Sequence, residues 1–250
     1  MSALYILWLR QIKKYFRNKA RIVGAVGQPL LFLIALGYGL GPTVEQSGIT
    51  DYISFLVPGI VGMTILFTST FIGIELIGDR MFGFLKETLV APVPRFYIML
   101  GKALGGATVA VFQGIIVFFL AIFIGFDISQ VTLGGALIAL TAAALIGLLF
   151  AAMGLVIASH MQDTSAFPLI INFVMFPIFF LSGALFPLTN IPPALELITK
   201  LNPFSYGVDA IRGGLVGSAE HPIWLDLTVV AGVTLVLLII GSWLFKKIQI

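Results

Sequence analysis

Residues 223–245 read IWLDLTVVAGVTLVLLIIGSWLF, and this stretch decides the fold class. Asp226, near its start, is the single charged residue in it. A helix that crosses the ~30 Å hydrocarbon core of a bilayer needs about 20 mainly apolar residues, because it rises about 1.5 Å per residue. Residues 223–245 therefore predict a membrane-spanning helix.

The composition of the whole chain agrees with this prediction. Of the 250 residues, 59% are hydrophobic and 10% are charged, whereas a soluble domain has about 45–50% and about 25%. The absence of cysteine excludes disulfide frameworks, thiolate metal sites and cysteine nucleophiles. The only two histidines, His160 and His221, lie far apart in the sequence, so we expect no metal site.

Five further segments are long and apolar enough to span a bilayer. They are residues 22–40, 55–76, 98–126, 132–158 and 164–186. In lipid every backbone polar group must be satisfied within the protein, which demands helices for all six segments. The sequence thus predicts an all-α membrane protein with six transmembrane helices, forming a single domain over residues 1–250.

The basic residues predict the orientation of these helices. With six spans and a cytoplasmic N-terminus, all of the 14 lysines and arginines except Lys200 and Arg212 lie on the cytoplasmic side. Cytoplasmic loops are the ones that carry an excess of Lys and Arg. We therefore expect a multi-pass protein of the plasma membrane with both termini in the cytoplasm.

Residues 1–21 precede the first span and have an amphipathic pattern. Aromatic and aliphatic residues recur at helical spacing, and basic residues recur on another face: Tyr5, Trp8, Leu9, Ile12 and Phe16 on the first, Arg10, Lys13, Lys14 and Arg17 on the second. Such a helix lies in the headgroup plane with its lysines toward anionic lipid. A signal peptide is the competing interpretation, but no small-residue cleavage pattern follows the apolar run. The pattern leaves open whether the helix only anchors the chain or also contacts a partner.

Residues 79–95 form the predicted cytoplasmic loop between the second and third spans. Phe82, Leu85 and Leu89 share one helical face, and Pro92 and Pro94 bar continuation of the helix. We expect a short amphipathic helix here. The pattern by itself favours an ordinary solvated connector.

Residues 187–212 are too interrupted by prolines to span the membrane and too apolar for a free outer loop. Pro192 and Pro193 favour a helix start, and Asn202-Pro203 favours the end of that helix and the start of another. Two short helices that re-enter the outer leaflet satisfy both observations.

Charged residues are missing from the predicted midplanes of the spans. Proton relays, voltage sensors and charged selectivity rings need such residues. The chain also lacks the H-E-x-x-H, G-x-S-x-G and GxxxxGK[ST] patterns, so it has no recognisable catalytic or ATP-hydrolysing site. Thr68 and Asn172 are polar residues within spans and are candidates for a substrate path, although such residues more often bridge helices.

Two stretches carry motifs that point to one family. The residues of the first motif are Asp79-Arg80, Gly83, Glu87, Thr88-Leu89 and Pro92-Val93-Pro94-Arg95. Those of the second are Ser182-Gly183, Phe186-Pro187, Pro192-Pro193, Leu195, Asn202-Pro203, Tyr206, Asp209 and Arg212. The first resembles the coupling-helix region of the membrane subunit of ABC-2-type exporters, with Met81 in place of its usual acidic residue, and the second resembles the outer re-entrant helices of that subunit. The resemblance covers essentially the whole chain.

The resemblance implies a division of labour between this chain and a partner. A separate cytoplasmic ABC ATPase would bind ATP and Mg²⁺, and this chain would bind no cofactor and no nucleic acid. Two copies, or this chain with a related one, would form the pathway, lined by the second and fifth spans. ATPase coupling would involve Asp79, Arg80, Gly83, Lys86, Glu87 and Thr88. An outer gate would involve Phe186, Pro187, Pro193, Pro203, Tyr206 and Arg212.

The expected function is therefore that of a permease in an ATP-driven exporter, without enzymatic activity of its own. A drug- or antibiotic-like hydrophobic or amphipathic compound is the expected cargo, since polar residues within the spans are few. A lipid-linked glycan is the alternative cargo within the family. A membrane scaffold or small channel that needs no ATPase is the alternative from another functional class.

Overall fold

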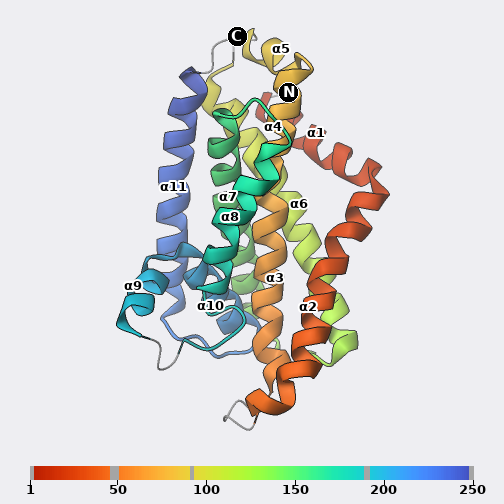
Figure 1. The fold of residues 1–250 in the computed structure, drawn as a ribbon, viewed down its shortest axis with the longest axis vertical. Helices are drawn as coiled ribbons and strands as arrows, with labels where there is room; N and C mark the ends of the chain where they lie inside the picture. Colours follow the sequence, from red (N-terminus) through yellow and green to blue (C-terminus); the bar gives the residue numbers. More distant parts are fainter. Residues whose placement is uncertain (1–2, 46–50, 91–92, 189–191, 248–250) are drawn as a thin grey trace.

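A computed structural model describes residues 3–45, 51–90, 93–188 and 192–247. In these residues the regular structure is helical, as predicted (Figure 1). The helices are α1 Ala3–Arg17, α2 Lys19–Glu45, α3 Tyr52–Thr70, α4 Ile72–Met81, α5 Phe84–Val90, α6 Arg95–Ile124, α7 Leu133–Ser159, α8 Ala166–Phe180, α9 Pro193–Leu201, α10 Pro203–Leu215 and α11 Ile223–Lys247, with a 3₁₀ turn, η1, at Ile128–Gln130.

Five segments of the described chain are long and apolar enough to cross a membrane. They are Ile22–Val44, Tyr52–Met81, Arg95–Ile124, Leu133–Ser159 and Ile223–Phe245. The fifth predicted span, residues 164–186, is instead the 15-residue helix α8 followed by a turn. At about 1.5 Å per residue α8 is shorter than a ~30 Å bilayer core. The count of six complete spans therefore stays a prediction.

The helix α8 ends early because its next residues form a hydrogen-bonded turn. The Ser182 hydroxyl donates to the carbonyl of Phe179 (2.6 Å) and accepts from the amide of Ala184 (3.2 Å). Gly183 has φ +74°, which glycine adopts without steric cost. This turn lies on α3, where a Cβ on Gly59 would stand 2.1 Å from the Ala184 oxygen.

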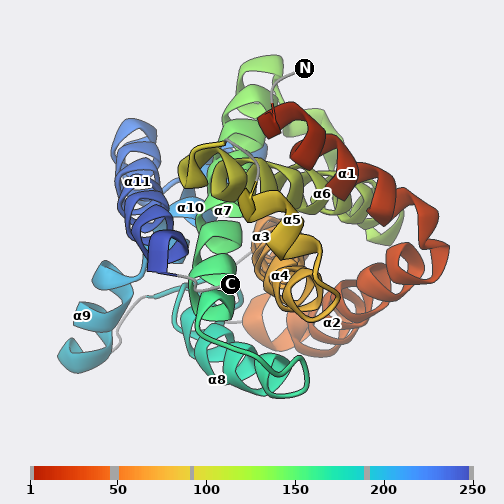
Figure 2. The same ribbon diagram turned by 90° about the horizontal axis from the view of Figure 1, so that it is seen from above.

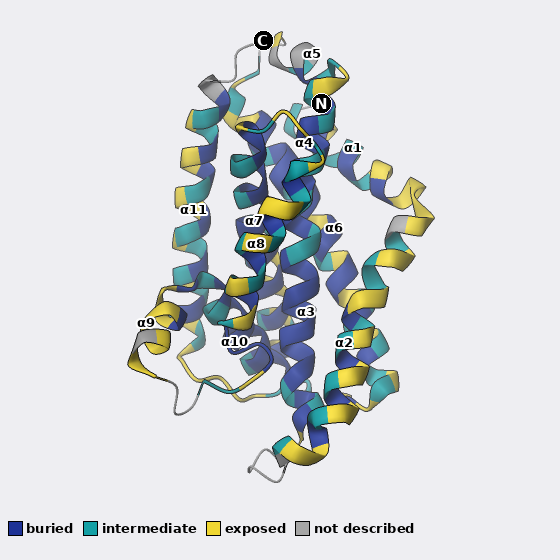
Figure 3. Cartoon of the chain, viewed as in Figure 1, coloured by how far each residue is buried: buried dark blue, intermediate teal, exposed yellow. Residues whose placement is uncertain are grey.

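The helices form a bundle with α3, α6 and α7 at its centre (Figure 2). Most of α3 is buried, whereas α2 and α11 expose apolar residues along much of their length (Figure 3). The beginning of α1 and the end of α11 lie at the same end of the bundle as α5, and α9 and α10 lie toward the other end (Figure 1). We call these the α5 end and the α9 end.

The second predicted span is longer than expected and is broken near the α5 end. The break is at Phe71, after which α4 continues to Met81. Just before it, Ser69 and Thr70 donate their hydroxyl hydrogens to the Leu66 carbonyl (3.2 and 2.7 Å), a back-bonding pattern that bends helices. Asp79 and Arg80 thus lie on α4, in line with the span, and not on the short helix α5 that follows.

The amphipathic helix α1 packs against α6. Its buried residues are Leu7, Gln11 and Tyr15, and a Cβ on Gly105 of α6 would stand 2.6 Å from the Gln11 side chain. The Tyr15 hydroxyl also donates a hydrogen bond to Gln113 of α6. Tyr5 and Phe16 of the predicted lipid-facing stripe are exposed. Glycines on α6 therefore give α1 a protein-facing side, opposite to the exposed one.

Two short helices lie where the prolines predict them. The helix α9 begins at Pro193, and Asn202 separates it from α10, which begins at Pro203. The Asn202 side chain accepts from the Phe204 amide (3.0 Å) and donates to the Ile178 carbonyl near the end of α8 (2.7 Å). Leu197 and Leu201 of α9 are exposed, which suits a helix at a membrane surface.

Replacing Asn202 with alanine should lower the free energy of unfolding by about 2 kcal/mol, since it removes a helix cap and leaves the Ile178 carbonyl without its buried donor. Asn202→Ser is the matched control, because its hydroxyl can still cap the helix and adds no charge, while the amide donor to the Ile178 carbonyl is lost. Thermal unfolding of the purified protein should rank the native chain above Asn202→Ser and that variant above Asn202→Ala. Equal stabilities for the two variants would mean that the cap contributes nothing.

Candidate functional site, a charged junction of four helices

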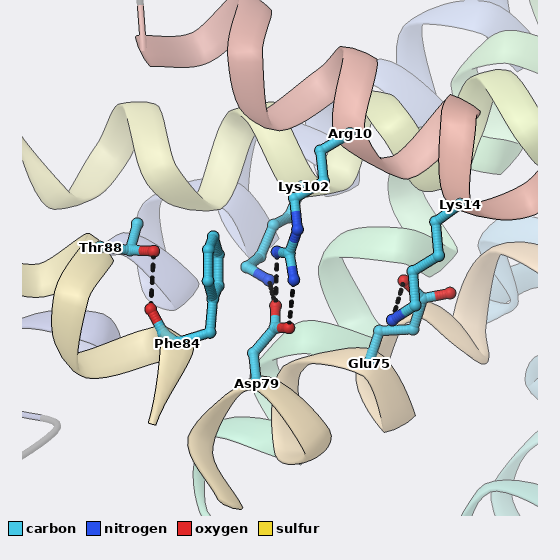
Figure 4. Close-up of polar contacts among 7 residues, drawn as sticks. All are labelled: Arg10, Lys14, Glu75, Asp79, Phe84, Thr88 and Lys102. Carbon is cyan, nitrogen blue, oxygen red and sulfur yellow. Dashed lines mark hydrogen bonds and ion pairs between the residues drawn. The ribbon is translucent and has the colours of Figure 1, made fainter. Parts of the chain in front are cut away.

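At the α5 end, charged side chains from helices that are distant in the sequence meet at one point (Figure 4). Asp79 near the end of α4 lies between Arg10 of α1 and Lys102 of α6, and Phe84 at the start of α5 lies beside Arg10. We call these four residues the charged junction. It links the predicted interfacial helix, two membrane helices and the predicted coupling helix.

The carboxylate of Asp79 is the centre of the charged junction. Arg10 donates to both of its oxygens, from Nη1 to Oδ2 at 3.0 Å and from Nη2 to Oδ1 at 2.7 Å. Lys102 Nζ donates to Oδ2 as well. Lys102 is 1% exposed and Asp79 is 6% exposed, so each buried charge depends on the other for compensation. Bidentate pairing with arginine also fixes the angle between α1 and α4.

Arg10 carries this connection on to α5. Its guanidinium carbon lies 3.6 Å from the centre of the Phe84 ring, within the range of a cation–π interaction. The hydroxyl of Thr88 donates to the Phe84 carbonyl (3.0 Å), which stabilises the first turn of α5, where Phe84 lies. A displacement of α5 would therefore act directly on the arginine that holds Asp79.

A second ion pair runs parallel to the first, one helical turn away. Lys14 Nζ of α1 lies 3.3 Å from Glu75 Oε2 of α4 (Figure 4). Glu75 is buried and Lys14 is about half exposed, so this pair is partly screened by solvent. Two cations of α1 thus face two carboxylates of α4, and the predicted placement of the helix in the headgroup plane stays a prediction.

Arg80 is directed away from the charged junction, toward the end of α7. Its two terminal nitrogens donate to the carbonyls of Ser159 and Met161, both at 2.9 Å. The last carbonyls of a helix lack intrahelical donors and carry partial negative charge, so a guanidinium there is favourable. Arg80 is a cap for α7 in the described structure, and its expected role in ATPase coupling stays a prediction.

The other predicted coupling residues lie around α5. Gly83, between α4 and α5, has φ +80° and allows the sharp change of direction there. Lys86 and Glu87 lie on α5, and their side chains are outside the described part of the structure. The predicted apolar face divides at this turn, because Phe82 precedes it and is exposed while Leu85 follows it and is buried.

The predicted outer-gate residues are split between the buried core and the surface. Arg212 is buried, donates to the Gly183 carbonyl (2.9 Å) and lies 4.0 Å above the Phe55 ring of α3. Its hydrogen bond to Gly183 therefore connects α10 to the turn after α8. The Tyr206 hydroxyl donates to the Lys200 carbonyl at the end of α9 (2.8 Å). The other predicted residues are partly or largely exposed: Phe186, Pro187, Pro193 and Pro203.

The two predicted substrate-path residues line no common cavity in the described part of the chain. Thr68 lines a cavity of about 200 Å³ with residues of α1, α2 and α3, among them Tyr15, Gln28 and Phe67. Asn172 is partly exposed on α8 and lines none of the cavities found in the described residues.

The sequence reasoning missed Arg10, Lys14, Glu75 and Lys102 as members of the site. A signal was available, since Arg10 and Lys14 are spaced i, i+4 and so are Glu75 and Asp79. Residues at that spacing share a helix face, so two complementary pairs on two helices favour contact between those faces. Lys102 is preceded by Gly101, and a Cβ there would stand 3.0 Å from the Leu4 carbonyl of α1.

Three known proteins are similar to this chain over most of its length. The chain is 28% identical over 228 residues to inner membrane transport permease YadH of Escherichia coli, covering 88% of this chain and 86% of that protein. It is 32% identical over 206 residues to nodulation protein J of Rhizobium leguminosarum bv. trifolii, covering 82% and 76%. It is 33% identical over 209 residues to putative transport permease ycf38 of Porphyra purpurea, covering 81% and 70%.

The family model of the ABC-2 type transporter matches residues 2–216, which contain the charged junction and both short outer helices. Helices α1 to α10 thus lie within the match. The chain therefore belongs to the ABC-2 type transporter family, as a membrane permease subunit of an ABC transporter.

Proposed function

We propose that this permease exports a hydrophobic or amphipathic compound, of drug or antibiotic type, using ATP hydrolysed by a separate cytoplasmic subunit. The α5 end faces the cytoplasm in this proposal, and the α9 end faces outward. The membrane subunits of this family lack the ATPase site, so the energy has to enter through a contact with the partner.

The observation that carries the proposal is the position of Asp79 in the charged junction. A series of contacts connects Phe84 of α5 to Arg10 and Arg10 to Asp79 of α4. The helix α4 directly follows α3, which lies at the centre of the bundle. When the ATPase subunit moves α5, Arg10 shifts with the Phe84 ring and changes its pull on Asp79. The break at Phe71 is the place where α4 can tilt without displacing all of α3.

The surface shared by α3 and α8 supports an apolar cargo. The rings of Phe67 and Phe176 lie 5.3 Å apart, and those of Phe176 and Phe180 lie 6.0 Å apart. Phe173 and Leu169 on the same helix α8 are largely exposed. Exposed apolar side chains on a membrane helix face either lipid or another protein surface. A second copy of the chain facing this surface would enclose an aromatic path, with Asn172 as a polar group within it.

A direct test is transport by the permease reconstituted with its ATPase subunit. Co-purification from native membranes should recover an ATP-binding protein with the tagged chain. Inside-out vesicles that contain the complex should then accumulate a lipophilic cationic dye only when ATP is supplied. A matched preparation with a hydrolysis-deficient ATPase subunit should show no accumulation.

Two results would contradict the proposal at different levels. If no ATP-binding protein co-purifies, the chain acts as a scaffold or channel and not as an exporter subunit. If the ATPase subunit is recovered but a range of hydrophobic dyes is not transported, the cargo is of another class, such as a lipid-linked glycan.

A further inference from the structure

Three potential metal ligands gather at the α9 end, far from the charged junction. They are Asp209 of α10, His221 in the segment that follows it, and Asp226 in the first turn of α11. One ligand atom of each lies within 4.8 Å of the others. We call these three residues the outer cluster.

Asp226 is the residue of the outer cluster that points to a missing ligand. Its side chain is 0% exposed, and neither carboxylate oxygen has a hydrogen-bond partner among the described residues. The nearest cationic candidate is His221, whose Nδ1 lies 3.9 Å from Asp226 Oδ1, too far for a hydrogen bond. A buried carboxylate without donors is costly unless a cation or a proton neutralises it.

Asp209 is held in place by backbone amides. Its oxygens accept from the amide nitrogen of Glu220 (2.9 and 3.0 Å) and from that of His221 (2.9 Å). These bonds fold the segment after α10 so that the His221 ring comes within 3.3 Å of Asp209 Oδ2. Hydrogen bonds that orient the ligating side chains in this way are typical of metal sites.

We propose that the outer cluster binds a divalent transition-metal ion, Zn²⁺ or Mn²⁺, that joins α10 to the start of α11. One imidazole and two carboxylates form a donor set that suits these ions. A dication offsets both buried carboxylates at once. Three protein ligands also leave a coordination position open for water or another oxygen ligand.

The surroundings of the outer cluster allow an ion to enter. Asp209 and His221 line a cavity of about 410 Å³, together with two further acids, Glu196 and Glu220. Of the two cations on its wall, Lys200 pairs with Glu196 at 2.7 Å, and Arg212 donates to the Gly183 carbonyl while its charge acts on Asp209 and Glu220. With Asp226 included, four acids thus outnumber the two cations. The His221 side chain is 45% exposed, so the site has a path to solvent.

Metal binding to the full-length chain in detergent tests this proposal. The chain carries a tag without histidines, is stripped with EDTA, and is titrated separately with Zn²⁺ and with Mn²⁺ by calorimetry. We expect about one ion per chain, and a rise in Tm of about 3 °C or more at saturating metal. Asp226→Asn and His221→Gln should each weaken binding by about 100-fold or more.

Asp127→Asn is the control, because Asp127 is an exposed acid that caps η1 and lies outside the outer cluster. It should bind metal as the parent does. The proposal fails if neither ion binds, or if Asp226→Asn binds as tightly as the parent. If the parent binds neither ion and the Asp226→Asn variant is more stable than the parent, a proton and not a metal ion neutralises the carboxylate, and the proposal fails.

Discussion

Replacing Asp79 with alanine is expected to lower substrate-stimulated ATPase activity of the reconstituted transporter by about tenfold or more. The substitution removes the carboxylate that pairs with the buried Lys102 ammonium, and it also removes both hydrogen bonds of Arg10 to α4. Breaking a buried ion pair by removing one partner costs about 3–5 kcal/mol. We therefore expect α1 to lose its fixed position on α4, and movements of α5 to stop reaching the membrane helices.

Loss of activity could also follow from misfolding, so the experiment needs a variant that separates the two effects. Asp79→Leu combined with Lys102→Met replaces the buried pair by apolar side chains of similar size, which is often neutral for stability. We expect this double variant to elute as a monodisperse complex with the ATPase subunit while remaining uncoupled. Basal ATPase activity of the complex should persist in both variants.

Asp163→Asn is the matched control for this series. Asp163 is an exposed acid near the α5 end, in the turn between α7 and α8, where it accepts only from the Ser165 amide (2.8 Å) among the described contacts. It should retain full coupling. If Asp79→Ala folds and its ATPase activity still responds to substrate as in the native complex, the charged junction does not transmit the movement of α5.

The membrane helices were predictable because their signal is local in the sequence. Helices α6, α7 and α11 begin and end within a few residues of the predicted spans, since a long apolar run has few structures other than a helix in lipid. The end of α8 was predicted too far along the chain because the sequence signal for that end is weak. Ser182 and Gly183 are small and compatible with a membrane helix, and only their hydrogen bonds and dihedral angles make them a turn.

The charged junction was harder to predict because its contacts join residues far apart in the chain. Arg10 and Lys102 each appear in the sequence as one more basic residue on the predicted cytoplasmic side. The distribution of basic residues along the chain predicts on which side of the membrane they lie, but it does not predict with which acidic residue each one pairs. Asp79 was singled out from a resemblance, and the reason for its importance, burial between two cations, needed the packed structure.

Alanine at Gly135 and alanine at Gly134 are expected to change stability in opposite directions, although the two glycines are neighbours on α7. A Cβ on Gly135 would stand 2.1 Å from the Gly214 carbonyl oxygen of α10, a backbone atom that cannot rotate away. A Cβ on Gly134 would meet nothing within 4 Å. We expect Gly135→Ala to cost about 1–3 kcal/mol or more through overpacking, and Gly134→Ala to gain up to about 1 kcal/mol in helix propensity.

The measurement is thermal unfolding of the two purified variants beside the native chain, with proteolysis of α10 as a local readout. Gly214→Ala should resemble Gly135→Ala, because its Cβ would stand 2.5 Å from the Gly135 oxygen at the same crossing. The two substitutions share one contact, so their combined cost should be less than the sum of the single costs. Equal melting temperatures for Gly134→Ala and Gly135→Ala would contradict the close crossing. Asp209 and Arg212 lie on the same helix α10 as Gly214, so loss of the crossing should also loosen the α9 end while the α5 end stays folded.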